Sequence, residues 1–185
     1  MTLDVPRLAA SLPNLRIRRE EPGDIPQLRA LVCAAFGRAD EARLLDRLRA
    51  EDALLLSHVA LLGDELVGQA AYSLVTVDDG AQPRHFPALG PIAVSPARQR
   101  QGIGSALVWT GLAAMRAAGY ALLFLVGHPS YYPRFGFVPA LPLGFKSDYV
   151  QPGGAHEPFM VAALEAGSLG SARGHVRYHK AFAAV

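Results

Sequence analysis

The feature that most constrains the fold is an apolar run that ends in a basic, glycine-containing turn and continues as an amphipathic helix. Residues 88–94 are apolar, Ser95-Pro96 ends the run, and residues 97–102 read Ala-Arg-Gln-Arg-Gln-Gly. Apolar residues then recur at helical spacing over residues 102–118. A strand that leads directly into a helix predicts an α/β or α+β chain and excludes a helical bundle or a β-sandwich.

Strand-like and helix-like segments alternate on both sides of this stretch. Strands are expected at residues 15–19, 53–62, 66–77, 121–127, 136–140 and 158–164, and helices at 25–35 and 40–50. Residues 78–87 and 141–155 are expected to be loops. A chain of 185 residues fits one domain. We therefore expect a single domain over residues 1–185, with its core at about 15–164 and a tail at 165–185 that the pattern leaves open.

Composition and charge exclude several classes of protein. The single cysteine, Cys33, excludes an intrachain disulfide and a cysteine-rich zinc site, and it fits a reducing cytoplasm. No run approaches the roughly 18 apolar residues of a membrane span. The net charge of +2 is too small to indicate a nucleic-acid or membrane binder. We expect a cytoplasmic protein, a monomer or homodimer, that binds neither nucleic acid nor membrane.

The basic residues are unevenly distributed along the chain. No Asp or Glu lies between Asp79 and Asp148. That segment holds the cations Arg84, Arg98, Arg100, Arg116, Arg134 and Lys146. A segment of one sign indicates an anion-binding region, and the alternative is a set of arginines on a solvated surface.

The turn before the expected central helix suits a phosphate. The first N–H groups of a helix lack partners within the helix, and its dipole favours an anion there. Gly102 and Gly104 would let a phosphate approach the backbone. A dinucleotide fold is disfavoured because Leu107 occupies the third glycine position, and no carboxylate follows before Asp148. The Gly-Lys-Ser/Thr of an ATP-binding loop is also absent, so NAD and ATP are poor candidates.

Three motifs in sequence order resemble those of the GNAT N-acetyltransferase superfamily. Gln99-Arg100-Gln101-Gly102-Ile103-Gly104 resembles its Gln/Arg-x-x-Gly-x-Gly/Ala signature, and the preceding Leu-Gly-Pro-Ile-Ala-Val resembles its acetyl-CoA-binding strand. Downstream, Tyr132-Pro133-Arg134-Phe135-Gly136-Phe137 resembles its Tyr-x-x-x-Gly-Phe motif. The match is closer to the YhbS-like branch through residues 127–137 and Phe159-Met160. The resemblance covers about residues 15–164.

This resemblance implies the GNAT fold, a mixed and mostly antiparallel sheet that is flanked by helices and splayed at the strand that binds CoA. It implies direct acetyl transfer from acetyl-CoA to an amine acceptor, either a small amine or a protein amine, without a metal. The cofactor-binding residues would be Ile92, Ala93, Val94, Gln99, Arg100, Gln101, Gly102, Ile103, Gly104, Ser105 and His128. An alternative is a protein that binds acyl-CoA as a sensor and has little or no turnover.

The resemblance also assigns an acid that protonates the departing thiolate. By motif this residue is Tyr132, and Tyr131 is the neighbouring alternative. Pro129 and Pro133 bracket the pair, and a residue before a proline avoids the helical region. We therefore expect Tyr132 to lie outside a regular helix.

The base that deprotonates the acceptor stays open. The family often uses a carboxylate at the start of the CoA-binding strand, where this chain has Ala88 and Leu89. Two kinds of group remain, a histidine that titrates near neutral pH and a carboxylate that acts through water. These candidates are His85, His128, Glu20, Glu21 and Asp79.

Overall fold

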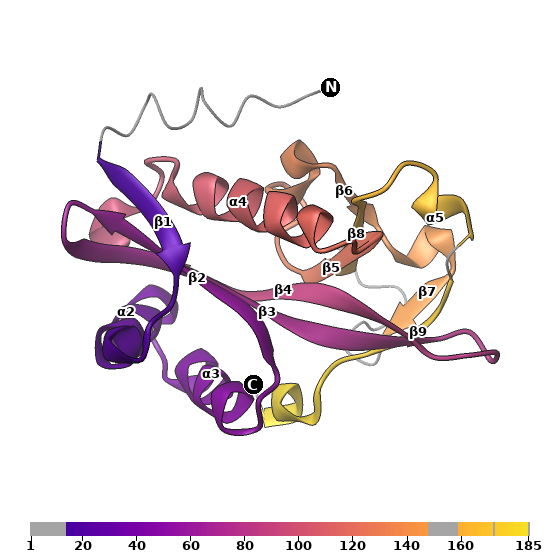
Figure 1. The fold of residues 1–185 in the computed structure, drawn as a ribbon, viewed down its shortest axis with the longest axis horizontal. Helices are drawn as coiled ribbons and strands as arrows, with labels where there is room; N and C mark the ends of the chain where they lie inside the picture. Colours follow the sequence, from indigo (N-terminus) through magenta and orange to yellow (C-terminus); the bar gives the residue numbers. More distant parts are fainter. Residues whose placement is uncertain (1–13, 148–158, 172, 185) are drawn as a thin grey trace.

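One nine-stranded sheet forms the middle of the molecule (Figure 1). The computed structural model describes residues 14–147, 159–171 and 173–184. The strands are β1 (Leu15–Arg19), β2 (Leu54–Leu62), β3 (Glu65–Asp78), β4 (Arg84–Val94), β5 (Leu122–Val126), β6 (Phe137–Pro139), β7 (Phe145–Ser147), β8 (Phe159–Ala163) and β9 (Gly174–Arg177). Their order is β1-β2-β3-β4-β5-β8-β6, and β9 pairs with β3 and β7. Among the described strands only β4–β5 and β7–β9 are parallel pairs, so the prediction of a mixed, mostly antiparallel sheet is confirmed.

Helices cover both faces of the sheet. The α-helices are α2 (Ile25–Phe36), α3 (Asp40–Ala50), α4 (Ile103–Ala117) and the short α5 (Ser168–Ser171). The 3₁₀ turns are η1 (Pro22–Asp24), η2 (Pro96–Arg98), η3 (Tyr132–Phe135), η4 (Leu141–Leu143) and η5 (Lys180–Ala184). Helix α4 lies on one face, and α2 and α3 lie on the other (Figure 1).

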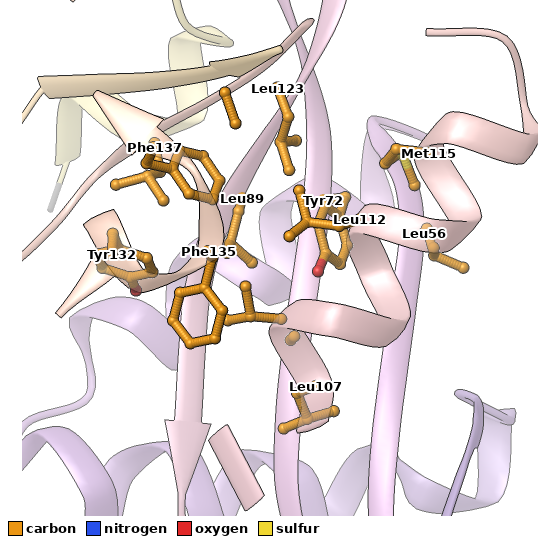
Figure 2. Close-up of a cluster of buried hydrophobic side chains, with 14 of the residues drawn as sticks. Leu56, Tyr72, Leu89, Leu107, Leu112, Met115, Leu123, Tyr132, Phe135 and Phe137 are labelled. Atoms are coloured by element: carbon orange, nitrogen blue, oxygen red, sulfur yellow. The ribbon is translucent and has the colours of Figure 1, made fainter. Parts of the chain in front are cut away.

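Strand β3 is buried on both faces because helices cover both. Tyr72 packs with α4 in the largest core cluster, whereas Ala71 packs with α2 and α3 on the opposite face. Figure 2 shows Tyr72 beside Leu112 of α4. A Cβ on Gly111 would lie 2.3 Å from Cζ of Tyr72, so α4 needs a glycine there to approach the sheet. This close packing fixes the position of α4, and with it the turn at its start.

The sheet splays open between β4 and β5. These two strands pair only at Ala88 with Phe124 and at Leu89 with Leu125. Strand β4 then continues to Val94 along β3, while β5 continues along β8. The edge of β4 beyond Leu89 is therefore without a strand neighbour on the β5 side among the described residues, and its N–H and C=O groups are available to a ligand.

A bulge lies in β4 at the same point. Ile92 is opposite Ala70 and Leu89 is opposite Tyr72, so two residues of β4 stand against one residue of β3. The extra residue places Leu89 and Ile92 on the same face although they are three positions apart, and both pack in the α4 cluster.

Two boundaries differ from the sequence expectation. Strand β4 begins at Arg84, so most of the loop expected at 78–87 is a long hairpin. Val77 and Phe86 are buried in a second core cluster, and their burial extends both strands. The expected loop at 141–155 contains η4 and β7, and its residues beyond 147 lie outside the described part of the chain.

The tail is more structured than the sequence indicated. Strand β9 pairs with β3 at residues Thr76 to Asp78, on the part of β3 that extends into the hairpin. Beyond it, Ala181 of η5 is buried against Leu44 and Leu48 of α3. Residues after 164 therefore contribute to the sheet and to the packing of α3.

Candidate active site

The start of α4 presents unpaired backbone amides. Gly102 is the N-cap residue with φ of 94°, a left-handed conformation that suits glycine. The hydrogen bond from Ala106 N to Gly102 O, of 2.9 Å, is the first turn of the helix. The amides of Ile103, Gly104 and Ser105 precede it and have no carbonyl within the helix to bind. With the helix dipole they form a site for an anion.

Side chains of the preceding turn hold its shape. Gln99 Nε2 donates to Val94 O at 3.2 Å, and Gln101 Nε2 donates to Ala97 O at 3.2 Å. Arg100 has φ of 60°, a conformation that is uncommon for a residue with a side chain. The predicted residues 99–105 thus form the turn between η2 and α4 together with the first residues of α4.

The basic segment does not gather into one patch. Arg84 lies at the first position of β4 and pairs with Asp79 at 3.3 Å. Arg116 lies in the last turn of α4, where its Nε donates to Leu164 O at 2.8 Å. The sequence placed these residues in one charged segment, but the fold separates them because α4 carries the chain away from its own N-terminus.

A cavity of about 460 Å³ occupies the gap between β4 and β5. We call it the cleft. Its lining residues are Phe36, Arg38, Glu41, Leu44, Leu89, Gly90, Pro91, Ile92, Val126, Gly127, His128, Tyr132, Tyr178 and Phe182. The cleft therefore brings together three predicted site residues. Ile92 comes from β4, His128 follows β5, and Tyr132 begins η3.

Tyr132 is a buried residue of the cleft wall. Its side chain packs against Phe135 and Phe137 and is 7% exposed (Figure 2). A Cβ on Gly127 would lie 2.3 Å from Cε2 of Tyr132, so the ring lies directly on the backbone at the end of β5. Burial, and secondly the neighbouring Tyr131, raise the pKa of Tyr132 well above its ordinary value. The hydroxyl therefore keeps its proton at neutral pH.

Tyr131 points to a different place. Its hydroxyl lies 3.3 Å from Ser105 Oγ, at the start of α4. A Cβ on Gly104 would lie 3.1 Å from the same hydroxyl oxygen, so glycine there permits the approach. The guanidinium of Arg134 lies 4.8 Å from the centre of the Tyr131 ring. Both tyrosines stand at a single 3₁₀ turn, which confirms the prediction that no regular helix forms there.

The candidate bases are dispersed. His128 lines the cleft. His85 lines a separate cavity of about 730 Å³, where its Nδ1 lies 3.2 Å from Oγ1 of Thr76. Asp79 pairs with Arg84, and Glu21 is exposed in the turn before α2. Among the sequence candidates, His128 alone lines the cleft as the structure describes it.

Glu20 belongs to a partly buried polar cluster with Arg49, Ser57 and Gln69. Its Oε2 accepts hydrogen bonds from Ser57 at 2.6 Å and from Gln69 at 2.9 Å, and Arg49 holds both carboxylate oxygens. Burial alone would raise the pKa of Glu20, but these donors outweigh it and lower the pKa below its ordinary value. A carboxylate held in this way is a poor proton acceptor.

Sequence reasoning missed the wall of the cleft that lies opposite the sheet. Phe36 and Glu41 come from α2 and α3, and Tyr178 and Phe182 come from the tail. The Glu41 carboxylate is buried and accepts hydrogen bonds from Nε of Arg38 at 3.1 and 3.2 Å. Its position in the helical repeat could have indicated this, because Glu41 lies on the same face of α3 as the leucines of that helix.

The described ranges hold neither a metal cluster nor a membrane-spanning helix. They contain no group of three or more His, Cys, Asp or Glu that could hold a metal ion. No helix in the same ranges is both long and apolar enough to cross a membrane.

Known proteins share this arrangement. Residues 16–140 match the acetyltransferase (GNAT) domain. The uncharacterised N-acetyltransferase YhbS of Escherichia coli K12 is 32% identical over 167 residues, which are 90% of this chain and 97% of YhbS. The crystal structure of E. coli YhbS in complex with CoA superposes with a TM-score of 0.83 over 92% of each chain. A GNAT acetyltransferase from Brucella melitensis in complex with acetyl-CoA is 34% identical with a TM-score of 0.74, over 91% of this chain and 97% of that one. The chain belongs to the GNAT acetyltransferase family and is similar to YhbS, as its motifs predicted.

Proposed function

We propose that this protein transfers the acetyl group of acetyl-CoA directly to an amine while both substrates are bound. The observation that carries the proposal is the cleft, which opens between β4 and β5 and contains a protonated, buried Tyr132. Relatives with the same fold were crystallised with CoA and with acetyl-CoA.

The residues present fit acetyl-CoA. The pantetheine arm would bind along the unpaired edge of β4 at Ile92, Ala93 and Val94, as an added strand does. The pyrophosphate would bind the free amides at the start of α4, where Gly104 leaves room near the backbone. The other proposed contacts are Gln99, Arg100, Gln101, Gly102, Ile103, Ser105 and His128.

The thioester would then lie beside Tyr132. The lone pair of a neutral amine attacks the carbonyl carbon, a C–N bond forms, and the C–S bond breaks with its electrons on sulfur. Tyr132 donates its proton to that sulfur, the proton lost by the amine leaves to solvent, and Tyr132 regains a proton from solvent before the next turnover. A free N–H near Ile92 would stabilise the negative charge on the carbonyl oxygen. The raised pKa of Tyr132 keeps its proton in place until the thiolate forms, and it also weakens the driving force of the transfer.

The substitution Tyr132→Phe tests the proposal because it keeps the ring and removes only the hydroxyl. We expect kcat to fall on the order of 10²–10⁴-fold, with acetyl-CoA binding unchanged by calorimetry. Tyr131→Phe is the matched control and should leave kcat nearly unchanged, since its hydroxyl points to Ser105. If the control is the damaged variant, Tyr131 is the acid. Acetyl-CoA binding without turnover on any amine would instead favour a sensor.

A further inference from the structure

We propose that the acceptor is a small monoamine with an apolar body, seated between Phe36 and Phe182 with its nitrogen at Glu41. The inference rests on the proposed function and concerns the side of the cleft away from β4 and β5. Helices α2 and α3 and the tail build that side, and the chain brings them together from regions about 140 residues apart.

The charges of the cleft disfavour a polyamine. Among its described lining residues Glu41 is the single carboxylate, and Arg38 is the single arginine or lysine. Arg38 holds Glu41 through its Nε and Nη2. Its Nε also lies 3.7 Å from Asp40, which pairs with Arg43, so the charges of this group balance. A polycation needs several carboxylates to offset the loss of its hydration. Glu41, with its charge already balanced, can accept a hydrogen bond from one amine nitrogen, but the cleft provides no counterion for a second, charged nitrogen.

Glu41 still has capacity for one more donor. A carboxylate offers about four lone-pair sites, and Arg38 uses sites on both oxygens without filling all of them. The side chain of Glu41 is buried and lines the same cleft as Tyr132. An amine nitrogen held there would be oriented by a hydrogen bond that it donates to Glu41.

The remaining walls are apolar. Phe36, Leu44 and Phe182 line the acceptor side, and Phe182 packs on Tyr178 with ring centroids 5.3 Å apart. A cavity of about 460 Å³ also has to admit the thioester end of acetyl-CoA, which leaves room there for only a small amine-bearing group. Apolar surroundings disfavour the charged form of an amine, and the neutral form is the nucleophile.

A panel of three amines tests the inference: phenethylamine, 1,4-diaminobutane and spermidine, with CoA release as the readout. We expect kcat/KM for phenethylamine to exceed that for either polyamine by at least about 10-fold. An equal or higher value for a polyamine would overturn the inference and leave the acetyltransferase assignment intact. If acetyl-CoA itself fails to bind in calorimetry, the proposed function fails instead. Binding of acetyl-CoA with no acetylation of phenethylamine would overturn the acceptor class.

Two variants locate the acceptor. Phe182→Ala should lower kcat/KM for phenethylamine about 10- to 200-fold, with Phe182→Leu retaining more activity and acetyl-CoA binding unchanged in both. Glu41→Gln keeps the size and should lower kcat/KM at least about 10-fold, whereas the exposed Glu165→Gln is the control and should not. Unchanged kinetics in both Phe182→Ala and Glu41→Gln would show that the acceptor binds elsewhere.

Discussion

The fold contains two carboxylates that are similarly buried and paired with arginine, yet their surroundings differ. Glu20 pairs with Arg49, and the two side chains are 12% and 18% exposed. Glu41 pairs with Arg38, and these side chains are 7% and 55% exposed. Ser57 and Gln69 add two further donors to Glu20, whereas Glu41 faces the cleft.

The comparison shows that burial alone does not decide what a carboxylate does. Glu20 is surrounded by donors on every side, so its charge is held for stability and is closed to a ligand. Glu41 is bound from one side by an arginine that extends into solvent, and its other side lines the cleft. The number of protein donors separates a structural carboxylate from one that can receive a substrate.

The largest expected effect follows from removing the charge of Glu20. Glu20→Gln leaves the mostly buried Arg49 with only its longer pairing to Asp46, at 3.4 Å, and we expect a loss of about 2 kcal/mol in the free energy of unfolding. Urea denaturation at pH 7 measures it, with Glu165→Gln as a control expected to change by less than about 0.5 kcal/mol. A loss no larger than that of the control would mean that the cluster is not structural.

The pH dependence of stability tests the same structural role of Glu20. Because the pKa of Glu20 is lowered by folding, its contribution is present above the unfolded pKa of about 4.3 and is lost as pH falls through the lowered value. The difference in stability between wild type and Glu20→Gln should therefore shrink between pH 5 and pH 3. Urea midpoints over this range test it, and a constant difference would contradict the assignment.

The smallest effect is expected at the other carboxylate. Glu41→Gln should change the free energy of unfolding by less than about 1 kcal/mol, because the half-exposed Arg38 can regain water. The same denaturation series checks this. A loss as large as that of Glu20→Gln would make Glu41 a structural residue and remove the contrast between the two pairs.

The local parts of the site could be predicted from the sequence. Contiguous residues form the strand, turn and helix over residues 84–117 and the turn at Tyr132, and their local propensities agree with the fold. Element positions were therefore close, although β4 began at Arg84 because burial of Val77 and Phe86 outweighed the polar loop pattern between them.

The acceptor side could not be predicted in the same way. Glu41 and Phe182 meet across the cleft because α3 and the tail pack together, through Ala181 on Leu44 and Leu48. No motif records such a contact, since it depends on where two remote segments are placed. The family motifs describe the CoA side and contain no residue of the acceptor side, so they leave that side unspecified.

The bulge in β4 has a consequence for the length of this strand in any redesign. Side chains of a strand alternate between faces, and the extra residue at Gly90-Pro91 absorbs one step of that alternation, so Leu89 and Ile92 face the same way. Deleting one of these two residues would remove the bulge and leave Ile92 and Val94 facing α4, whereas deleting a residue just after Ile92 would exchange the faces of the rest of β4. A one-residue alignment gap at the bulge is therefore compatible with the same two faces of β4, whereas the same gap between Ile92 and Val94 would exchange them.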